Sequence, residues 1–195
     1  MPRQEHEPPT QRAWATPTAI LVFFATVWWV VGLSSAGHPP ELVYPLPLLV
    51  AAAVGLAAWR RTRLDRSAPQ VAADAVDQAR RNRLVAWASG AEGLALFVVA
   101  GVVLPSTGHR DATVSAIALI VGAHFVPLAR GLPAPTYYVT AVALVALGLA
   151  GFGISDVNAR ITTVSAGAAI VLWLTAATVL RRAARHRGPA AGSAR

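Results

Sequence analysis

The sequence contains no cysteine and no lysine, and it has few charged residues of either sign. The absence of cysteine excludes a disulfide framework, a thiolate zinc site, an iron–sulfur cluster and a cysteine nucleophile. Charged residues make up 13% of the 195 residues, about half the fraction that is typical of a soluble domain. Hydrophobic residues make up 55%, and this composition predicts a membrane protein.

The signatures of common enzymes are also missing. The chain has no HExxH zinc motif, no P-loop, no dinucleotide-binding glycine motif and no G-x-S-x-G nucleophile elbow. A haem held between two histidines is not expected either, because only His124 falls inside an apolar run. We therefore predict no cofactor and no metal site, and the sequence favours a role other than catalysis.

Six apolar runs are long enough to cross a membrane. A helix rises ~1.5 Å per residue and needs about 20 residues to cross ~30 Å of hydrocarbon. The connections between most of the runs are short, which makes successive helices antiparallel neighbours. The sequence thus predicts an all-α fold, a six-helix transmembrane bundle over residues 13–181, with spans at 14–35, 42–59, 84–105, 112–129, 136–154 and 161–180.

The first run allows a second interpretation. Ser34, Ser35 and Ala36 follow it and resemble the small residues of a signal-peptidase site, so cleavage there would leave five spans. The apolar run from Trp14 is about 20 residues long, however, which exceeds the 7 to 15 residues typical of a signal sequence. The length favours a helix that is retained.

The arginines are distributed unevenly along the chain. Of the 17 arginines, 15 fall near the two termini, in the long connection 60–83 or at Arg130, and only Arg110 and Arg160 fall on the other side of the predicted spans. The positive-inside rule places the connection and both termini in the cytoplasm. Topology then accounts for the net charge of +8 without a nucleic-acid partner. The abundance of alanine and arginine is typical of a bacterial protein, so we predict the inner membrane.

The cytoplasmic segments carry no apolar pattern that would bury them in a core. Residues 1–12 and 182–195 are predicted to be disordered tails, and the connection 60–83 is predicted to contain a short helix. Basic residues beside a membrane attract anionic lipid headgroups. The candidates for contact with lipid or with a soluble partner are Arg60, Arg61, Arg63, Arg80, Arg81 and Arg83.

Glu92 is the only charged residue inside the six predicted spans. A charge at the centre of a bilayer costs at least ~2.5 to 3.5 kcal/mol on insertion scales, so an acid retained there indicates a role. Glu92 and His124 each lie about 16 residues from the middle of the turn that joins their spans, which predicts equal depth. Counting does not determine rotation about each helix axis. Ser89 and Thr175 are candidate polar neighbours at comparable depth.

Two functions are consistent with these residues. A buried Glu–His pair can share one proton and titrate as a unit, which is the chemistry of a proton relay in pumps and transporters. The first hypothesis is therefore a small proton- or ion-linked transporter or channel. The alternative is a structural or accessory membrane subunit, in which the pair sets helix packing and the basic connection docks a partner. The sequence determines neither the substrate nor the oligomeric state.

The sequence contains two weaker patterns. Five side chains that bind metals elsewhere fall in short outer connections, but without a known ligand spacing, and we predict ordinary solvated residues at His38, Glu41, His109, Asp111 and Asp156. Pairs of small residues four positions apart allow helices to approach closely. Such pairs occur at Ser89 and Gly93, at Ala118 and Gly122, and at Gly151 and Ser155.

Overall fold

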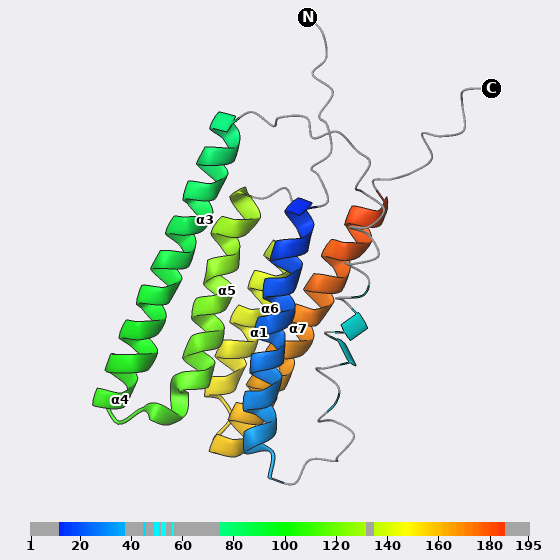
Figure 1. The fold of residues 1–195 in the computed structure, drawn as a ribbon. Coiled ribbons are helices and arrows are strands. Elements are labelled where there is room, and N and C mark those ends of the chain that lie inside the picture. Colours follow the sequence, from blue (N-terminus) through cyan, green and yellow to red (C-terminus); the bar gives the residue numbers. More distant parts are fainter. Residues whose placement is uncertain are drawn as a thin grey trace, which may run out of the picture.

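A computed structural model shows the chain as a bundle of helices that lie side by side (Figure 1). It describes residues 12–37, 75–131 and 135–185, with six further residues between 45 and 56. Within these ranges all regular structure is helical. The elements are α1 (Arg12–Ser35), α3 (Ala75–Ala95), the π-helix η2 (Leu96–Val103), α4 (Leu104–Ser106), the 3₁₀ turn η3 (Arg110–Ala112), α5 (Thr113–Gly131), α6 (Thr136–Phe152) and α7 (Val157–Arg185).

Four helical segments are long and apolar enough to cross a membrane. They cover Thr18–Ser35, Arg83–Ser106, Arg110–Gly131 and Val157–Arg182, and they correspond to the first, third, fourth and sixth predicted spans. The fifth predicted span is the apolar helix α6, which is shorter at 17 residues. The second, 42–59, lies mostly outside the described residues. The length and composition of these helices indicate a protein embedded in a membrane.

The helix that contains the third span is longer than the span itself. The sequence analysis predicted a short helix within the connection 60–83 and a span at 84–105. Instead one continuous helical segment runs from Ala75 through α3, η2 and α4 to Ser106. Residues 75–89 contain neither glycine nor proline and are rich in alanine and arginine, which are strong helix formers. Nothing in this stretch therefore ends the helix at the membrane boundary.

The last helix also begins earlier than predicted. The carboxylate Oδ1 of Asp156 accepts a hydrogen bond from the backbone N–H of Ala159 at 2.6 Å, which is the contact of an N-cap. This cap starts α7 at Val157, whereas the apolar pattern alone placed the start at 161. Arg160 consequently lies in the first turn of α7 and not in a loop.

The turn between α4 and α5 makes these two helices antiparallel. Gly108 has a φ of 78°, a left-handed conformation that glycine adopts without a steric penalty. The N–H of His109 donates to the carbonyl of Leu104 at 2.9 Å, and the N–H of Gly108 donates to the carbonyl of Pro105 at 3.4 Å. These two bonds form a Schellman cap, which ends the helix and reverses the chain.

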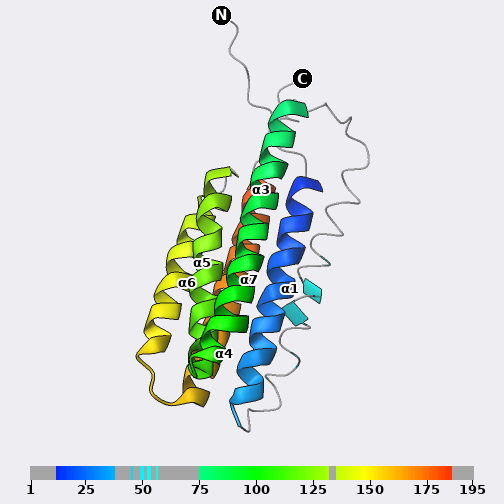
Figure 2. The ribbon, with the colours of Figure 1, turned by 90° about the vertical axis from the view of Figure 1, so that its left-hand side faces the viewer.

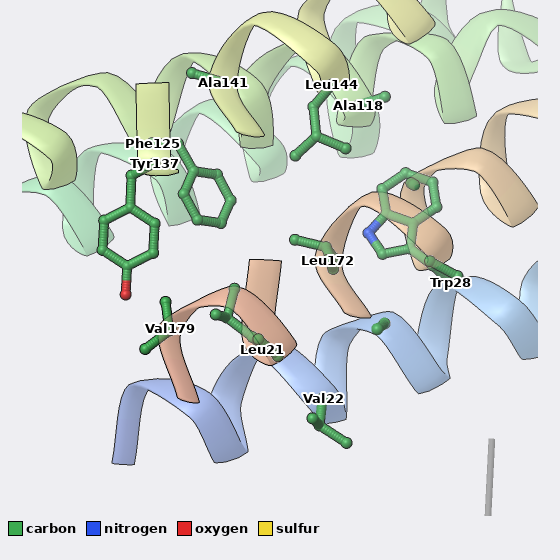
Figure 3. Packing of buried hydrophobic residues seen from close by; sticks show 14 of the residues in the cluster. Leu21, Val22, Trp28, Ala118, Phe125, Tyr137, Ala141, Leu144, Leu172 and Val179 are labelled. Atoms are coloured by element: carbon green, nitrogen blue, oxygen red, sulfur yellow. The ribbon is translucent and has the colours of Figure 1, made fainter. Parts of the chain in front are cut away.

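The helices pack in pairs. α1 packs on α7, α5 packs on α6, and α6 packs on α7, while α3 lies at the edge of the bundle against α5 (Figure 2). The core between these helices is formed by fully buried side chains such as Leu144 and Leu172 (Figure 3). Phe125 of α5 and Tyr137 of α6 pack ring against ring, with centroids 5.7 Å apart.

Two glycines allow α5 and α6 to approach each other closely. A Cβ atom on Gly122 would lie 2.9 Å from the backbone nitrogen of Val145, and one on Gly148 would lie 2.8 Å from the carbonyl oxygen of Ser115. The pair Ala118 and Gly122 therefore lies in a helix contact. Gly93, in contrast, has no neighbouring atom within 4 Å of such a Cβ.

Large apolar side chains also cover the outside of the bundle. Phe23 on α1, Phe97 on η2 and Val139 on α6 are each more than 60% exposed. Water-soluble monomers rarely expose contiguous apolar surfaces of this size, whereas acyl chains solvate such surfaces without cost. The exterior thus agrees with the membrane environment that the long apolar helices indicate.

The two ends of the bundle differ in charge. α1 and α3 begin, and α5 and α7 end, at the same end of the bundle, which we call the arginine end (Figure 1). The opposite end, which we call the hairpin end, holds the turns around Gly108 and Ser155 and carries Arg110 and Arg160. At the arginine end lie Arg12, Arg80, Arg81, Arg83, Arg130, Arg181, Arg182 and Arg185.

Candidate functional site

The structure brings Glu92 of α3 and His124 of α5 together. The Nδ1 atom of His124 lies 3.4 Å from Oε2 of Glu92. The two side chains are largely enclosed, with exposed fractions of 11% for His124 and 21% for Glu92. Since each residue lies on an apolar helix long enough to cross a membrane, this is an ionisable pair within the apolar part of the bundle.

α5 contacts α6 with one face and α3 with another. Ser115, Ala118 and Gly122 lie on one face of α5 and are buried, and Gly122 contacts α6. His124 is two residues beyond Gly122, so its side chain leaves the helix about 160° away and reaches α3. The small residues and the histidine therefore occupy different faces of the same helix.

The same ring nitrogen has a second neighbour. Nδ1 of His124 lies 3.2 Å from the backbone carbonyl oxygen of Ala88. Ala88 is four residues before Glu92, so both groups lie on the same face of α3, one turn apart. The ring nitrogen consequently lies between a carbonyl oxygen and a carboxylate oxygen.

Both helices depart from regular α-helical hydrogen bonding near the pair. The π-helix η2 begins at Leu96, four residues after Glu92. On α5, Pro127 lies three residues after His124, lacks an N–H and leaves the carbonyl of Ala123 without its usual helical donor. π-Helical segments are rare and occur frequently at functional sites. The sequence analysis did not predict η2. The local sequence signal for η2 is its four valines, because residues branched at Cβ fit less well in a regular α-helix.

The two candidate polar neighbours are not part of this contact. Ser89 is exposed on α3. Thr175 lies on α7, where its Oγ1 is 2.6 Å from Oγ1 of Thr140 and donates to the carbonyl of Val171 at 2.8 Å. The face of α7 that carries Thr175 packs on α6, and equal depth in the bundle therefore did not bring Thr175 to Glu92.

The basic residues predicted to contact lipid are described only in part. Arg60, Arg61 and Arg63 lie outside the described residues. Arg80, Arg81 and Arg83 lie on the first turns of α3 at the arginine end, and the side chain of Arg83 is exposed there.

The residues with metal-binding side chains in the short connections form separate contacts. Nδ1 of His109 lies 3.2 Å from Oγ1 of Thr107, Asp156 caps α7, and Asp111 pairs with Arg160. His38 and Glu41 lie outside the described residues. The part of the chain that the structure describes contains no group of three or more His, Cys, Asp or Glu side chains close enough to hold a metal ion.

Arg160 forms a polar contact that the sequence analysis missed. Its Nη1 donates to Oδ2 of Asp111 at 2.8 Å and to the carbonyl of Asp111 at 3.1 Å, and its Nε donates to the carbonyl of Ile154 at 2.9 Å. Its side chain is only 9% exposed. This single guanidinium joins the start of α7 to the turn before α5 and to the end of α6 at the hairpin end.

We predict that Arg160→Gln lowers the stability of the bundle. The substitution removes the hydrogen bonds that the guanidinium donates to Asp111 and Ile154, each worth about 0.5–1.5 kcal/mol. The measurement is the unfolding midpoint of the purified protein in detergent. Arg110→Gln is the matched control, because Arg110 lies beside Asp111 and is exposed. Equal midpoints for the two variants would show that the Arg160 contacts do not stabilise the fold.

Comparisons with known proteins do not assign this arrangement to a family. No family model, no curated protein and no solved structure matches the chain.

Proposed function

We propose that the chain crosses the inner membrane of a bacterium six times, with both termini in the cytoplasm. α1 ends at the hairpin end, while α3 begins at the arginine end. The chain between Gly37 and Ala75 therefore has to return along the bundle, which supports a crossing by the apolar run 42–59. The clustering of arginines at one end supports a cytoplasmic location for that end.

The topology can be tested with single cysteines, because the natural chain has none. We expect a membrane-impermeant maleimide to label Ser34→Cys and Thr107→Cys in intact cells, since both residues are exposed at the hairpin end. Arg182→Cys, exposed at the arginine end, should react only after permeabilisation. Labelling of all three variants in intact cells, or of Arg182→Cys alone, would contradict this topology.

We further propose that the protein moves protons, alone or together with a solute, through the pair formed by Glu92 and His124. The observation that carries this proposal is the 3.4 Å contact between the carboxylate and the imidazole. A carboxylate beside an imidazole neutralises the charge that the ring gains when it takes up a proton in the membrane. Ionisable residues are costly in a bilayer, so their presence there supports a functional role.

The proposal is tested with the full-length protein in sealed vesicles that contain a pH-sensitive dye. A potassium diffusion potential, set with valinomycin, drives protons inward. We expect the lumen to acidify faster than in protein-free vesicles. Acidification at the protein-free rate would contradict proton movement by the protein alone.

A structural or accessory role is the second candidate, and one observation favours it. The hydrophobic segment from Arg83 to Ser106 contains no buried residue, so α3 is attached mainly through its contact with α5. In this role the Glu92–His124 contact holds α3 in place, and the arginines of α3 bind anionic lipid headgroups or a soluble partner. The accessory role predicts that loss of the carboxylate lowers stability and changes no flux.

A further inference from the structure

We infer that the backbone carbonyl of Ala88 keeps a proton on Nδ1 of His124, so that Nε2 is the ring nitrogen through which the pair takes up and releases its mobile proton. This inference rests on the proposed proton-handling function, and it adds the atom at which the proton arrives. It follows from the two distances at Nδ1 and from the chemistry of the groups involved.

The first step concerns the carbonyl. A carbonyl oxygen can only accept a hydrogen bond, and Nδ1 lies 3.2 Å from that of Ala88. An unprotonated Nδ1 would direct its lone pair at the lone pairs of the oxygen, and in an apolar region such a contact leaves two acceptors unsatisfied. Nδ1 therefore carries a hydrogen in the neutral ring as well as in the charged ring.

The second step concerns the carboxylate. Oε2 of Glu92 lies 3.4 Å from the same nitrogen, and a negative charge at this distance favours a hydrogen on Nδ1 over a lone pair. Among the described residues, Glu92 is the only acidic group within ion-pair distance of His124. The carbonyl and the carboxylate together make Nδ1 the donor. In metal-bound histidines, likewise, an acceptor beside the ring nitrogen that does not bind the metal fixes the hydrogen on that nitrogen.

The third step identifies the ring nitrogen that is free to bind a proton. A neutral imidazole with hydrogen on Nδ1 has its free lone pair on Nε2. An arriving proton forms a new N–H bond at Nε2, and the resulting imidazolium lies beside the Glu92 carboxylate as a net neutral pair. Release breaks the same Nε2–H bond and restores the neutral ring. Ala88 acts as a positioning residue in this cycle, because its carbonyl sets the tautomer without exchanging a proton.

Nitrogen NMR tests the tautomer directly. The full-length protein labelled with ¹⁵N-histidine contains five histidines, and the His124 signals are those lost in His124→Asn. We expect, above the pH at which the ring becomes neutral, a protonated Nδ1 and an unprotonated Nε2. On acidification the Nε2 signal should shift to the protonated position. A neutral ring with its hydrogen on Nε2 would overturn the inference, whatever the flux measurements show.

Two variants separate proton exchange from packing. The amide nitrogen of His124→Asn can occupy the position of Nδ1 and donate to Ala88, but the variant has no group in place of Nε2. We expect it to unfold near the wild-type temperature and to move protons at the protein-free rate. His124→Gln places its amide farther out, near the position of Nε2, and we expect it to lose both flux and thermal stability.

The outcomes distinguish the inference from the function on which it rests. If the wild-type vesicles move no protons, proton movement by the protein alone is contradicted, and the NMR spectrum still decides the tautomer. If wild-type and His124→Asn move protons equally fast, the role of Nε2 is overturned while proton movement stands. Wild-type flux with its loss in His124→Asn, together with a protonated Nδ1, supports both.

Discussion

Vesicles that contain Glu92→Gln should acidify no faster than protein-free vesicles under a potential that drives protons through the wild-type protein. The glutamine side chain has nearly the same shape as glutamate, and its Oε1 can lie at the same position beside Nδ1 of His124 as an acceptor. It carries no charge, so it cannot neutralise the imidazolium that forms when His124 takes up a proton. Flux is therefore lost while the contact between α3 and α5 is kept, so the unfolding temperature should stay close to that of the wild type.

The matched control for this experiment is Asp156→Asn. It makes the same change from carboxylate to amide, but at an exposed position of the hairpin end, and asparagine caps a helix as well as aspartate does. We expect wild-type flux from this variant. Full flux in Glu92→Gln would remove Glu92 from any proton pathway. A lower unfolding temperature for Glu92→Gln without any flux change would favour the accessory role.

Gly148→Ala should destabilise the bundle strongly. The new Cβ would lie 2.8 Å from the backbone carbonyl oxygen of Ser115 and 3.0 Å from the backbone nitrogen of Leu119. Because these are backbone atoms of α5, they cannot rotate away as the end of a side chain can. The two helices have to separate, at a cost of about 1–3 kcal/mol for such overpacking. The measurement is the free energy of unfolding in mixed micelles.

Gly93→Ala is the control for this substitution. It adds the same methyl group to a helix in the same bundle, at a position where the Cβ meets no atom within 4 Å. We expect its stability to equal or exceed that of the wild type, because alanine favours the helix over glycine by up to about 1 kcal/mol. Equal loss of stability in both variants would indicate that the loss in Gly148→Ala does not come from the close approach of α5 and α6.

The candidate site was partly predictable. Counting residues from the turn at Gly108 places Glu92 and His124 at one depth, because an α-helix rises by a constant amount per residue. The same count gave Thr175 a similar depth, and the structure pairs it with Thr140 instead. Depth depends on spacing along one helix, whereas contact depends also on the rotation of two helices and on which helices are neighbours.

The contacts of Arg160 show a second limit of prediction. The sequence placed this residue in a polar connection, because one arginine before an apolar run resembles a solvated loop residue. The cap at Asp156 extends α7 by one turn and turns Arg160 toward Asp111, 49 positions earlier in the chain. No local pattern links these two positions, since their contact requires that α5, α6 and α7 pack first.

The amino-acid sequence by itself determined which segments form long apolar helices, where arginine concentrates and how deep the ionisable residues lie. These properties depend on composition and on the regular rise of a helix, and both are local. Only the tertiary structure decided that His124 faces Ala88 and Glu92, that Gly122 and Gly148 lie between α5 and α6, and that Arg160 is enclosed. The physical reason is that the rotation of each helix is set by the packing of all its faces together.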